Sequence, residues 1–323
     1  MNAPNHLQQG IELVRAMRAE IAKVFVGQDR LIEQTITALL AGGHVLLEGV
    51  PGLGKTLLVK ALAKTLGGRF ARIQFTPDLM PADITGHAMF DAASGKFVIR
   101  RGPLFANLVL ADEINRAPAK TQSALLEVMQ EGQVTIEGTP HELTPPFLVL
   151  ATQNPIEQEG TYALPEAQLD RFLLKVMIDY PSAEHERMLV QHVTRERVGD
   201  RLDVEAVNQV VTPEQVTALQ ALAASLRVDD AVVDYAVRIA RKTREWPGIA
   251  VGAGPRGGIA LVRAARGLAL LAGRDFVTPD DVKTIAPAAL RHRVMLAPEA
   301  EIEGLTVDQL LNNLLTQVDA PRA

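Results

Sequence analysis

Two patterns of apolar positions divide the chain near residue 180. Before that point, short runs of consecutive apolar residues alternate with segments whose apolar positions recur at helical spacing. Continuous apolar runs are typical of strands that are covered on both faces, and their alternation with helices predicts a parallel α/β sheet. The strands predicted in this way are 44–48, 108–111, 147–151 and 173–178.

Helical spacing is clearest in two places within this first half. The segment 56–66 directly follows the first predicted strand and is expected to form a helix. Between residues 111 and 132, one helical face collects Ala124, Leu125, Val128 and Met129. An apolar face of this kind is expected to pack against a sheet.

Two further segments of the first half have the pattern of β-hairpins. In the segment 84–101, the stretches 84–87 and 97–100 flank the turn-forming residues 91–95. A second alternating stretch, 133–143, has a glycine at its centre. Both segments are predicted to be hairpins inserted into the α/β fold.

After Tyr180 the strand patterns stop and helix starts take over. Thr212 and Thr278 are each followed by proline, which combines an N-cap residue with the residue preferred at the first helical position. Further helices are expected over 229–246 and 255–273. The second half is therefore predicted to be a helical bundle.

The composition agrees with two packed domains. A chain of 323 residues exceeds the usual size of a single core, and 47% hydrophobic residues are ample for packing. We expect an α/β domain over residues 1–182, followed by a smaller all-helical domain over residues 183–323.

Composition also excludes several classes of protein. No apolar run reaches the about 18 residues that span a bilayer, and the first ten residues lack the layout of a secretion signal. The chain has no cysteine, which excludes disulfides and thiolate metal sites. We expect a cytoplasmic protein without membrane insertion. The net charge of −5 makes nucleic acid an unexpected partner, although a locally basic pore stays compatible with it.

The most informative motif follows the first predicted strand. Its pattern is Gly, four residues, then Gly-Lys-Thr, and it opens the predicted helix. Such a loop turns backbone N–H groups towards an anion, Lys55 can reach the β and γ phosphates, and the Thr56 hydroxyl can ligate Mg²⁺. The residues expected to hold the nucleotide here are Gly49, Val50, Pro51, Gly52, Leu53, Gly54, Lys55 and Thr56.

Two carboxylates end the strand predicted at 108–111. At the carboxyl edge of a parallel sheet, Asp112 would hold Mg²⁺ and Glu113 would polarise the water that attacks the γ-phosphate. An acidic pair after a strand is also common in solvated turns. Asn154 follows the strand at 147–151 and could bind the attacking water or the γ-phosphate, although Asn-Pro is an ordinary turn as well.

The order of these elements along the chain resembles that of the AAA+ ATPases, and the amino-acid sequences of the motifs resemble those of the MoxR family. Close sequence similarity covers about residues 25–182, whereas the helical half matches the family chiefly through Gly254-Pro255-Arg256. The matching stretches are 49–56, 83–86, 102–107, 110–117, 120–127, 151–155 and 164–172. The chain departs from the family pattern at Tyr162-Ala163 and Gly257-Gly258, which affects mainly the helical domain over residues 183–323, called the lid in this family.

The resemblance implies roles that the residues alone do not show. Arg171 matches the arginine finger that reaches the ATP of a neighbouring subunit, and Arg256 matches the lid arginine that touches the γ-phosphate in its own subunit. Val26 lies in the segment that matches the lining of the adenine pocket. Arg116 could also project towards the neighbour. A surface salt bridge with Asp170 or Glu166 would explain Arg171, and a position at the start of a helix would explain Arg256 without a ligand. Arg116 also has an ordinary structural interpretation, and core packing would explain Val26.

As a function, the resemblance implies Mg²⁺-dependent ATP hydrolysis in a homo-oligomeric ring, expected to be a hexamer. Relatives act as chaperone-like remodellers of a protein client, often with a partner that has a von Willebrand factor A domain. The two hairpins are candidates for contacting the client or lining the pore. A metal chelatase, a DNA-translocating motor and an ATP-gated scaffold with little turnover remain alternatives.

Two further features receive ordinary structural interpretations. The basic stretch 238–244 is expected to be an ion-paired helix face rather than a nucleic-acid site. The histidines lack the spacing of metal ligands, and His292, between two arginines, is expected at the surface.

Overall fold

The centre of the molecule is a parallel sheet of five strands in the order β2-β5-β8-β1-β9. The computed structural model describes residues 3–50, 52–154, 161–194 and 204–321. The strands of the sheet are β1 (Val45–Glu48), β2 (Phe70–Gln74), β5 (Leu108–Asp112), β8 (Leu148–Gln153) and β9 (Leu174–Met177). The predicted α/β class and parallel sheet are confirmed. The edge strand β2 was not predicted, because only part of it is buried and it lacks a continuous apolar run.

The register of the sheet brings the polar strand ends together. Leu47 pairs with Thr152 across β1 and β8, and Gln74 pairs with Asp112 across β2 and β5. Because all of these strands run in the same direction, the residues that follow them collect at one edge of the sheet.

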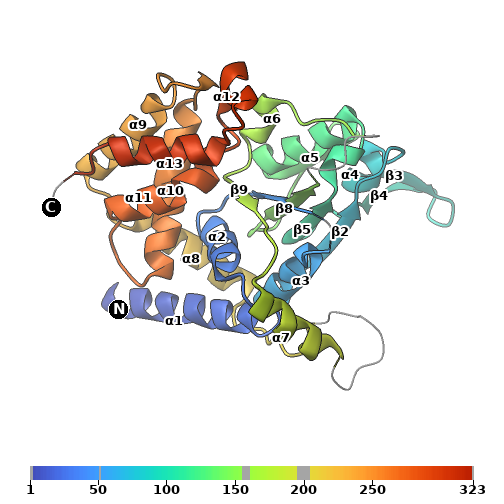
Figure 1. Cartoon of the computed structure of the whole chain (residues 1–323). Helices are drawn as coiled ribbons and strands as arrows, with labels where there is room; N and C mark the ends of the chain where they lie inside the picture. Colours follow the sequence, from blue (N-terminus) through green and yellow to red (C-terminus); the bar gives the residue numbers. More distant parts are fainter. Residues whose placement is uncertain (1–2, 51, 155–160, 195–203, 322–323) are drawn as a thin grey trace.

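Helices cover this sheet and connect its strands (Figure 1). The 12-residue helix that follows β1 begins at Lys55, one residue earlier than predicted. The helical elements of the first half are α1 (Ala3–Ala22), α2 (Asp29–Leu40), α3 (Lys55–Leu66), α4 (Pro81–Thr85), η1 (Ile114–Arg116), α5 (Ala119–Glu131) and α6 (Glu166–Leu169).

Both predicted hairpins form. Strands β3 (Gly86–Asp91) and β4 (Lys96–Arg101) pair antiparallel and project from the body of the molecule (Figure 1). Ile84 and Thr85, which were predicted to be in the first strand, instead end α4, because Pro81 starts a helical turn there. Strands β6 (Gln133–Ile136) and β7 (Thr139–Glu142) form the second hairpin.

The second half is mainly helical, as predicted. Thr212 and Thr278 cap their helices through their side chains, and Gln215 completes a capping box with Thr212. The helices are α7 (Ala183–Thr194), α8 (Pro213–Ser225), α9 (Asp230–Lys242), α10 (Pro255–Leu271), α11 (Pro279–Leu290), α12 (Pro298–Ile302) and α13 (Val307–Gln317). The expectation of an all-helical domain is wrong in one detail, since β10 (Ile249–Val251) and β11 (Met295–Leu296) pair antiparallel. Strands of two or three residues are too short to show a period.

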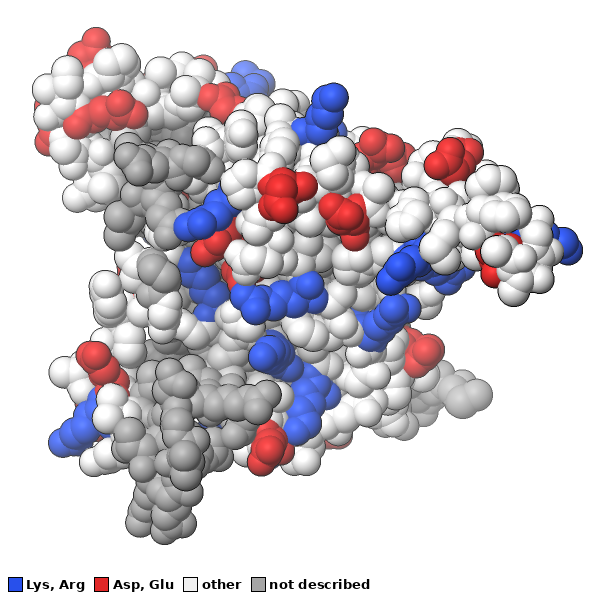
Figure 2. Space-filling view, turned by 90° about the vertical axis from the view of Figure 1, so that its right-hand side faces the viewer, with Lys and Arg blue, Asp and Glu red and all other residues white. Residues whose placement is uncertain are grey.

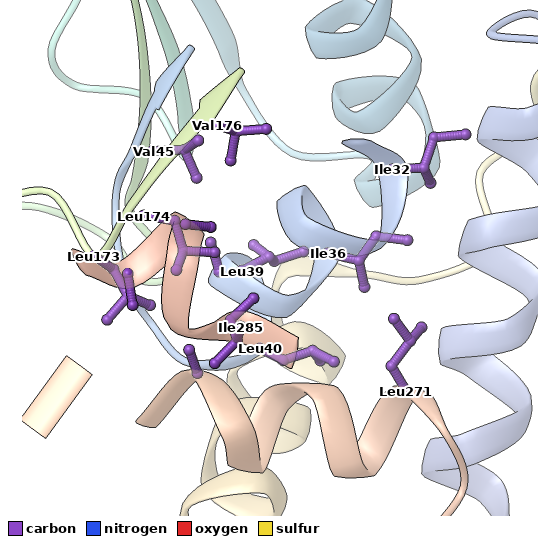
Figure 3. Close-up of a cluster of buried hydrophobic side chains, with 14 of the residues drawn as sticks. Ile32, Ile36, Leu39, Leu40, Val45, Leu173, Leu174, Val176, Leu271 and Ile285 are labelled. Carbon is purple, nitrogen blue, oxygen red and sulfur yellow. The ribbon is translucent and has the colours of Figure 1, made fainter. Parts of the chain in front are cut away.

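Helix α2 joins the two halves into one apolar core. It lies between the β1–β9 edge of the sheet and the helices α10 and α11, and nine of its residues are buried. The side chains that meet there include Ile32, Ile36, Leu39 and Leu40 of α2, Val45 of β1, Leu174 and Val176 of β9, Leu271 of α10 and Ile285 of α11 (Figure 3). The helical half therefore has no separate core on this side.

Charge is distributed unevenly over the surface. Figure 2 shows basic side chains gathered across the middle of one face, although the whole chain carries a net charge of −5. In the part of the chain that the structure describes, no helix has both the length and the apolar character needed to cross a membrane.

His44 holds the start of β1 against its neighbours. The backbone N–H of Val149 donates to Nδ1 at 3.0 Å, so the ring proton lies on Nε2, which donates to the Met129 carbonyl oxygen at 3.0 Å. Burial lowers the pKa of His44 from 6.5 to about 4. The neutral ring is the form that both hydrogen bonds require.

We expect this histidine to make the free energy of unfolding pH-dependent. Between pH 6.5 and pH 4 the unfolded chain binds the proton that the folded chain refuses, so stability is fully present above pH 6.5 and falls as the pH falls through this window. The loss amounts to about 3 kcal/mol at most. Denaturant titrations should show a shallower pH slope for His44→Gln than for the wild type. A control variant, His87→Gln on the exposed hairpin, should keep the wild-type slope; equal slopes in all three proteins would contradict the prediction.

Candidate functional site

The loop between β1 and α3 has the backbone of a phosphate-binding loop. Gly52 and Gly54 adopt φ values of +86° and +79°, which favour glycine. A Cβ on Gly54 would also lie 3.1 Å from the Phe25 ring. The loop leads into the N-terminus of α3, where free N–H groups and the helix dipole favour an anion. Pro51 lies outside the described residues.

Lys55 crosses this loop. Its ammonium group donates to the carbonyl oxygens of Gly49 and Gln153, the latter at 3.3 Å. The cation is thus held between the end of β1 and the end of β8, inside the loop. A phosphate there would meet a lysine that is already oriented.

A chain of hydrogen bonds joins the carboxylate strand to β8. The backbone N–H of Glu113 donates to the Thr152 hydroxyl at 2.8 Å, and that hydroxyl donates to Asp112 Oδ1 at 2.6 Å. This arrangement fixes the direction of Asp112 at the edge of the sheet. Thr152 was missed in the sequence, although a threonine at the end of an apolar strand was visible there.

Strand β2 supplies two more polar groups to the same edge. Arg72 pairs with Asp112 Oδ2 at 2.6 Å, and Gln74 Nε2 donates to Glu113 at 2.9 Å. Sequence reasoning missed both residues because it missed the strand. Their alternate spacing, which puts them on one face beside the carboxylates, was the available indication.

Glu113 has an unusual backbone for a residue with a side chain. Its φ of 56° places it in the left-handed region, where it starts the η1 turn. Its carboxylate accepts from Gln74 and lies 3.0 Å from Arg116 Nε. Because of this ion pair, the Arg116 guanidinium is paired within its own chain. Left-handed backbone conformations of non-glycine residues cost free energy and are found preferentially at functional sites.

Four of the residues predicted to bind phosphate and both predicted carboxylates line one cavity of about 350 Å³. Its lining includes Gly52, Gly54, Lys55, Thr56, Asp112, Glu113, Thr152 and Asn154. The Thr56 hydroxyl and the Asp112 carboxylate are oxygen donors of the kind that Mg²⁺ takes when it is also bound by phosphates and water. The residues present therefore fit the metal that the motif implies.

A second cavity, of about 220 Å³, adjoins the loop on its apolar side. Phe25 and Val26 line it together with Leu53, Tyr180 and His185. Gly52 and Gly54 line both cavities, so the two lie on either side of the loop. Val26 therefore lies in a cavity beside the phosphate loop.

Arg171 and Arg256 line a different cavity, of about 410 Å³. It also contains Gly43 and His44, which precede β1, and Leu173, which precedes β9. This is the amino edge of the sheet, opposite the phosphate loop, and the cavities at the two edges share no lining residue. The prediction that Arg256 touches the nucleotide of its own chain is therefore wrong in this arrangement, because the packing of the helical half carries α10 to the other edge.

Asp170 and the arginines of the helical half connect this cavity to the lid. Arg256 lies 3.5 Å from one carboxylate oxygen of Asp170, and Arg293 lies 2.6 Å from the other. The expectation that His292 is at the surface is wrong. Its ring is buried, and Nε2 donates to the Phe172 carbonyl oxygen at 3.0 Å. The turn after α11 folds inward, which local sequence does not reveal.

Comparisons with known proteins agree with this geometry. Residues 44–174 match the model of the ATPase family associated with various cellular activities (AAA), and residues 241–314 match the AAA lid domain. Chaperone MoxR1 of Mycobacterium tuberculosis is 46% identical over 94% of this chain and 81% of its own length. The uncharacterized protein YeaC of Bacillus subtilis is 48% identical over 93% of this chain and 92% of its own.

A solved structure shows the same fold over nearly the whole chain. The crystal structure of a protein from Cytophaga hutchinsonii, described as a candidate ATPase, superposes with a TM-score of 0.90 at 40% identity. The match covers 99% of this chain and 98% of that one. The fold, the phosphate loop with its two carboxylates and the full-length relatives lead to one conclusion: the chain belongs to the MoxR family of AAA+ ATPases.

Proposed function

We propose that the chain is a Mg²⁺-dependent ATPase that works as a homo-oligomeric ring and remodels a protein client. One observation carries the proposal. The cavity at the carboxyl edge of the sheet brings together a phosphate loop, two carboxylates and a buried asparagine, while the candidate finger Arg171 lines a cavity at the opposite edge. Each chain thus holds one half of a shared site.

Within one subunit, the phosphate loop binds the nucleotide. Backbone N–H groups of residues 52–56 and the Lys55 ammonium group hold the phosphates, and the base lies in the cavity that Val26 lines. Thr56 and Asp112 would hold Mg²⁺, which supplies charge neutralisation on the phosphate oxygens. Glu113 polarises the attacking water and Asn154 positions it. To reach the attacking water, the Glu113 carboxylate has to break its contacts with Gln74 and Arg116 and turn towards the γ-phosphate.

The charge that develops in the transition state requires a cation from outside. Four paired residues of β1 and β9 separate the two edges of the sheet, on the order of 13 Å at the rise of a strand. Arg171 and Arg256 therefore reach the nucleotide of a neighbour rather than their own. A guanidinium suits this role, because it stays charged and grips phosphate oxygens in a bidentate way.

A head-to-tail contact of this kind closes into a ring when the rotation between subunits closes. The family resemblance suggests a cytoplasmic hexamer and a partner with a von Willebrand factor A domain. The β3–β4 hairpin supports a client role, because Phe90 and Phe97 stack edge to face at its exposed tip. Exposed aromatic pairs are suited to apolar segments of a client.

We expect ATP turnover to depend on assembly. If each site needs an arginine from a neighbour, phosphate release per subunit should rise with protein concentration until the oligomer is complete. The measurement is steady-state phosphate release across a dilution series, with the oligomeric state followed by light scattering. Undiminished turnover by a demonstrated monomer would refute the shared site. Turnover that requires added DNA would favour the translocating motor instead.

A further inference from the structure

We propose that Arg293 positions the arginine finger: it holds the backbone on both sides of Arg171 and the carboxylate of Asp170, so that Arg171 faces the neighbouring subunit. The inference rests on the proposed function, in which Arg171 acts across the subunit contact. In that role Arg293 touches no nucleotide. It acts through the segment that carries Arg171.

The contacts of Arg293 surround the finger residue. Its side chain is only 4% exposed, and Nε pairs with Asp170 Oδ1 at 2.6 Å. One terminal nitrogen donates to the carbonyl oxygens of Asp170 at 3.2 Å and Phe172 at 2.7 Å. The other donates to the Leu173 carbonyl oxygen at 3.2 Å and to that of Ala289. A planar guanidinium with donors on both edges thus holds residues 170–173 in one geometry.

The two ion pairs that Asp170 forms, with Arg256 and with Arg293, differ in strength. Arg256 is 54% exposed and 3.5 Å from Asp170, which is the geometry of a weak, exchangeable surface pair. Arg293 is buried, and burial lowers its pKa while Asp170 opposes that shift. A buried cation that loses its partner is strongly destabilised, so this pair persists. Arg256 can therefore turn towards a neighbour's phosphate while Arg293 keeps Arg171 in place.

The same turn makes two further contacts with the sheet domain, one at the finger segment and one within β9. His292 donates to the Phe172 carbonyl oxygen, and Arg291 donates to the Lys175 carbonyl oxygen at 3.1 Å. Residues 291–293 directly follow α11 of the lid. The position of the finger therefore depends on the lid of its own subunit.

The test is a double-mutant cycle on the assembled protein. We expect Arg293→Met to lower kcat on the order of 10²-fold, as small misplacements of catalytic groups do, with an unchanged KM for ATP. We expect Arg171→Ala to lower kcat further. The double variant should then be no slower than Arg171→Ala alone, because Arg293 acts only through Arg171.

Arg291→Met is the matched control. The side chain of Arg291, in the same turn, is also buried, but its hydrogen bonds go to Asp308 at 2.9 Å and to the Lys175 carbonyl oxygen within β9, rather than to residues 170–173. Any loss of kcat that it causes should multiply with that of Arg171→Ala. Thermal unfolding of each variant shows whether the two substitutions cost similar stability.

The outcomes separate the two proposals. Losses from Arg293→Met and Arg171→Ala that multiply, or a wild-type kcat for Arg293→Met, would overturn the positioning role alone. A wild-type kcat for Arg171→Ala would refute the finger and the positioning role together. If Arg293→Met does not fold, Arg293→Lys, which keeps the buried charge and loses the planar fork of donors, replaces it in the same cycle with the same expectation.

Discussion

An equimolar mixture of Arg171→Ala and Glu113→Gln subunits is expected to hydrolyse ATP, although each variant alone is inactive. Arg171→Ala should bind ATP normally and hydrolyse it on the order of 10³-fold more slowly, the low end of the range for arginine fingers. Its own site keeps Glu113 and lacks only the cation from the neighbour. The Glu113→Gln subunit supplies that cation.

The expected recovery follows from the geometry of a ring. Each contact between subunits joins one nucleotide site to one finger, in head-to-tail order. With random exchange, about a quarter of the contacts combine an intact Glu113 with an intact Arg171, so phosphate release should reach about a quarter of the wild-type rate.

A control variant makes the recovery specific to the finger. Arg238→Ala removes an exposed arginine on α9 that pairs with Asp234, away from both cavities. Mixed with Glu113→Gln, it should show only the dilution expected of active subunits. No recovery at any ratio, after confirmed exchange, would contradict a finger that acts across subunits. A dilution series of wild type into Glu113→Gln detects ring-wide silencing, which would hide the recovery.

Lys55→Ala and Glu113→Gln are expected to fail in different ways. Lys55 lies within the phosphate loop and contributes to binding in the ground state, so its loss should weaken ATP binding by about tenfold to a hundredfold, as for hydrogen bonds to charged groups. Glu113 acts on the water, so Glu113→Gln should keep ATP affinity and lose hydrolysis by about 10²- to 10⁴-fold.

Titration with a fluorescent ATP analogue, together with phosphate release, separates the two effects. Lys64→Ala is the matched control for the lysine, because Lys64 lies on the same helix and donates to the carbonyl oxygens of Val204 and Glu205, outside the cavity. It should bind ATP like the wild type. An equal loss of affinity in the Lys55 and Glu113 variants would overturn the roles assigned to them.

The phosphate site could be predicted because its parts are local. A loop with a given glycine pattern and a carboxylate pair after an apolar strand each have a chemical meaning within a few residues. A parallel sheet then brings such strand ends to one edge without further information. For the same reason both hairpins and the threonine caps were predictable, since each depends on neighbours in sequence.

The other parts of the site depend on packing between distant segments. Arg72 and Gln74 reach the carboxylates only because β2 lies beside β5, and half-buried edge strands leave a weak pattern. Arg256 and His292 were misplaced because their surroundings depend on where the lid packs. The roles of Asn154, Val26 and Mg²⁺, the hexamer and the domain boundary at residue 182 stay predictions.

The position of α2 has a consequence for engineering the protein. This helix precedes the phosphate loop in sequence, yet its apolar side chains fill the space between the sheet and α10 and α11 (Figure 3). A chimera that takes only residues after 182 from a relative would set foreign α10 and α11 against the original α2, and mismatched volumes in a packed core are destabilising. The transplantable lid is therefore discontinuous: it consists of the C-terminal helices together with α2, and lids exchanged between relatives should fold only when both pieces come from the same donor.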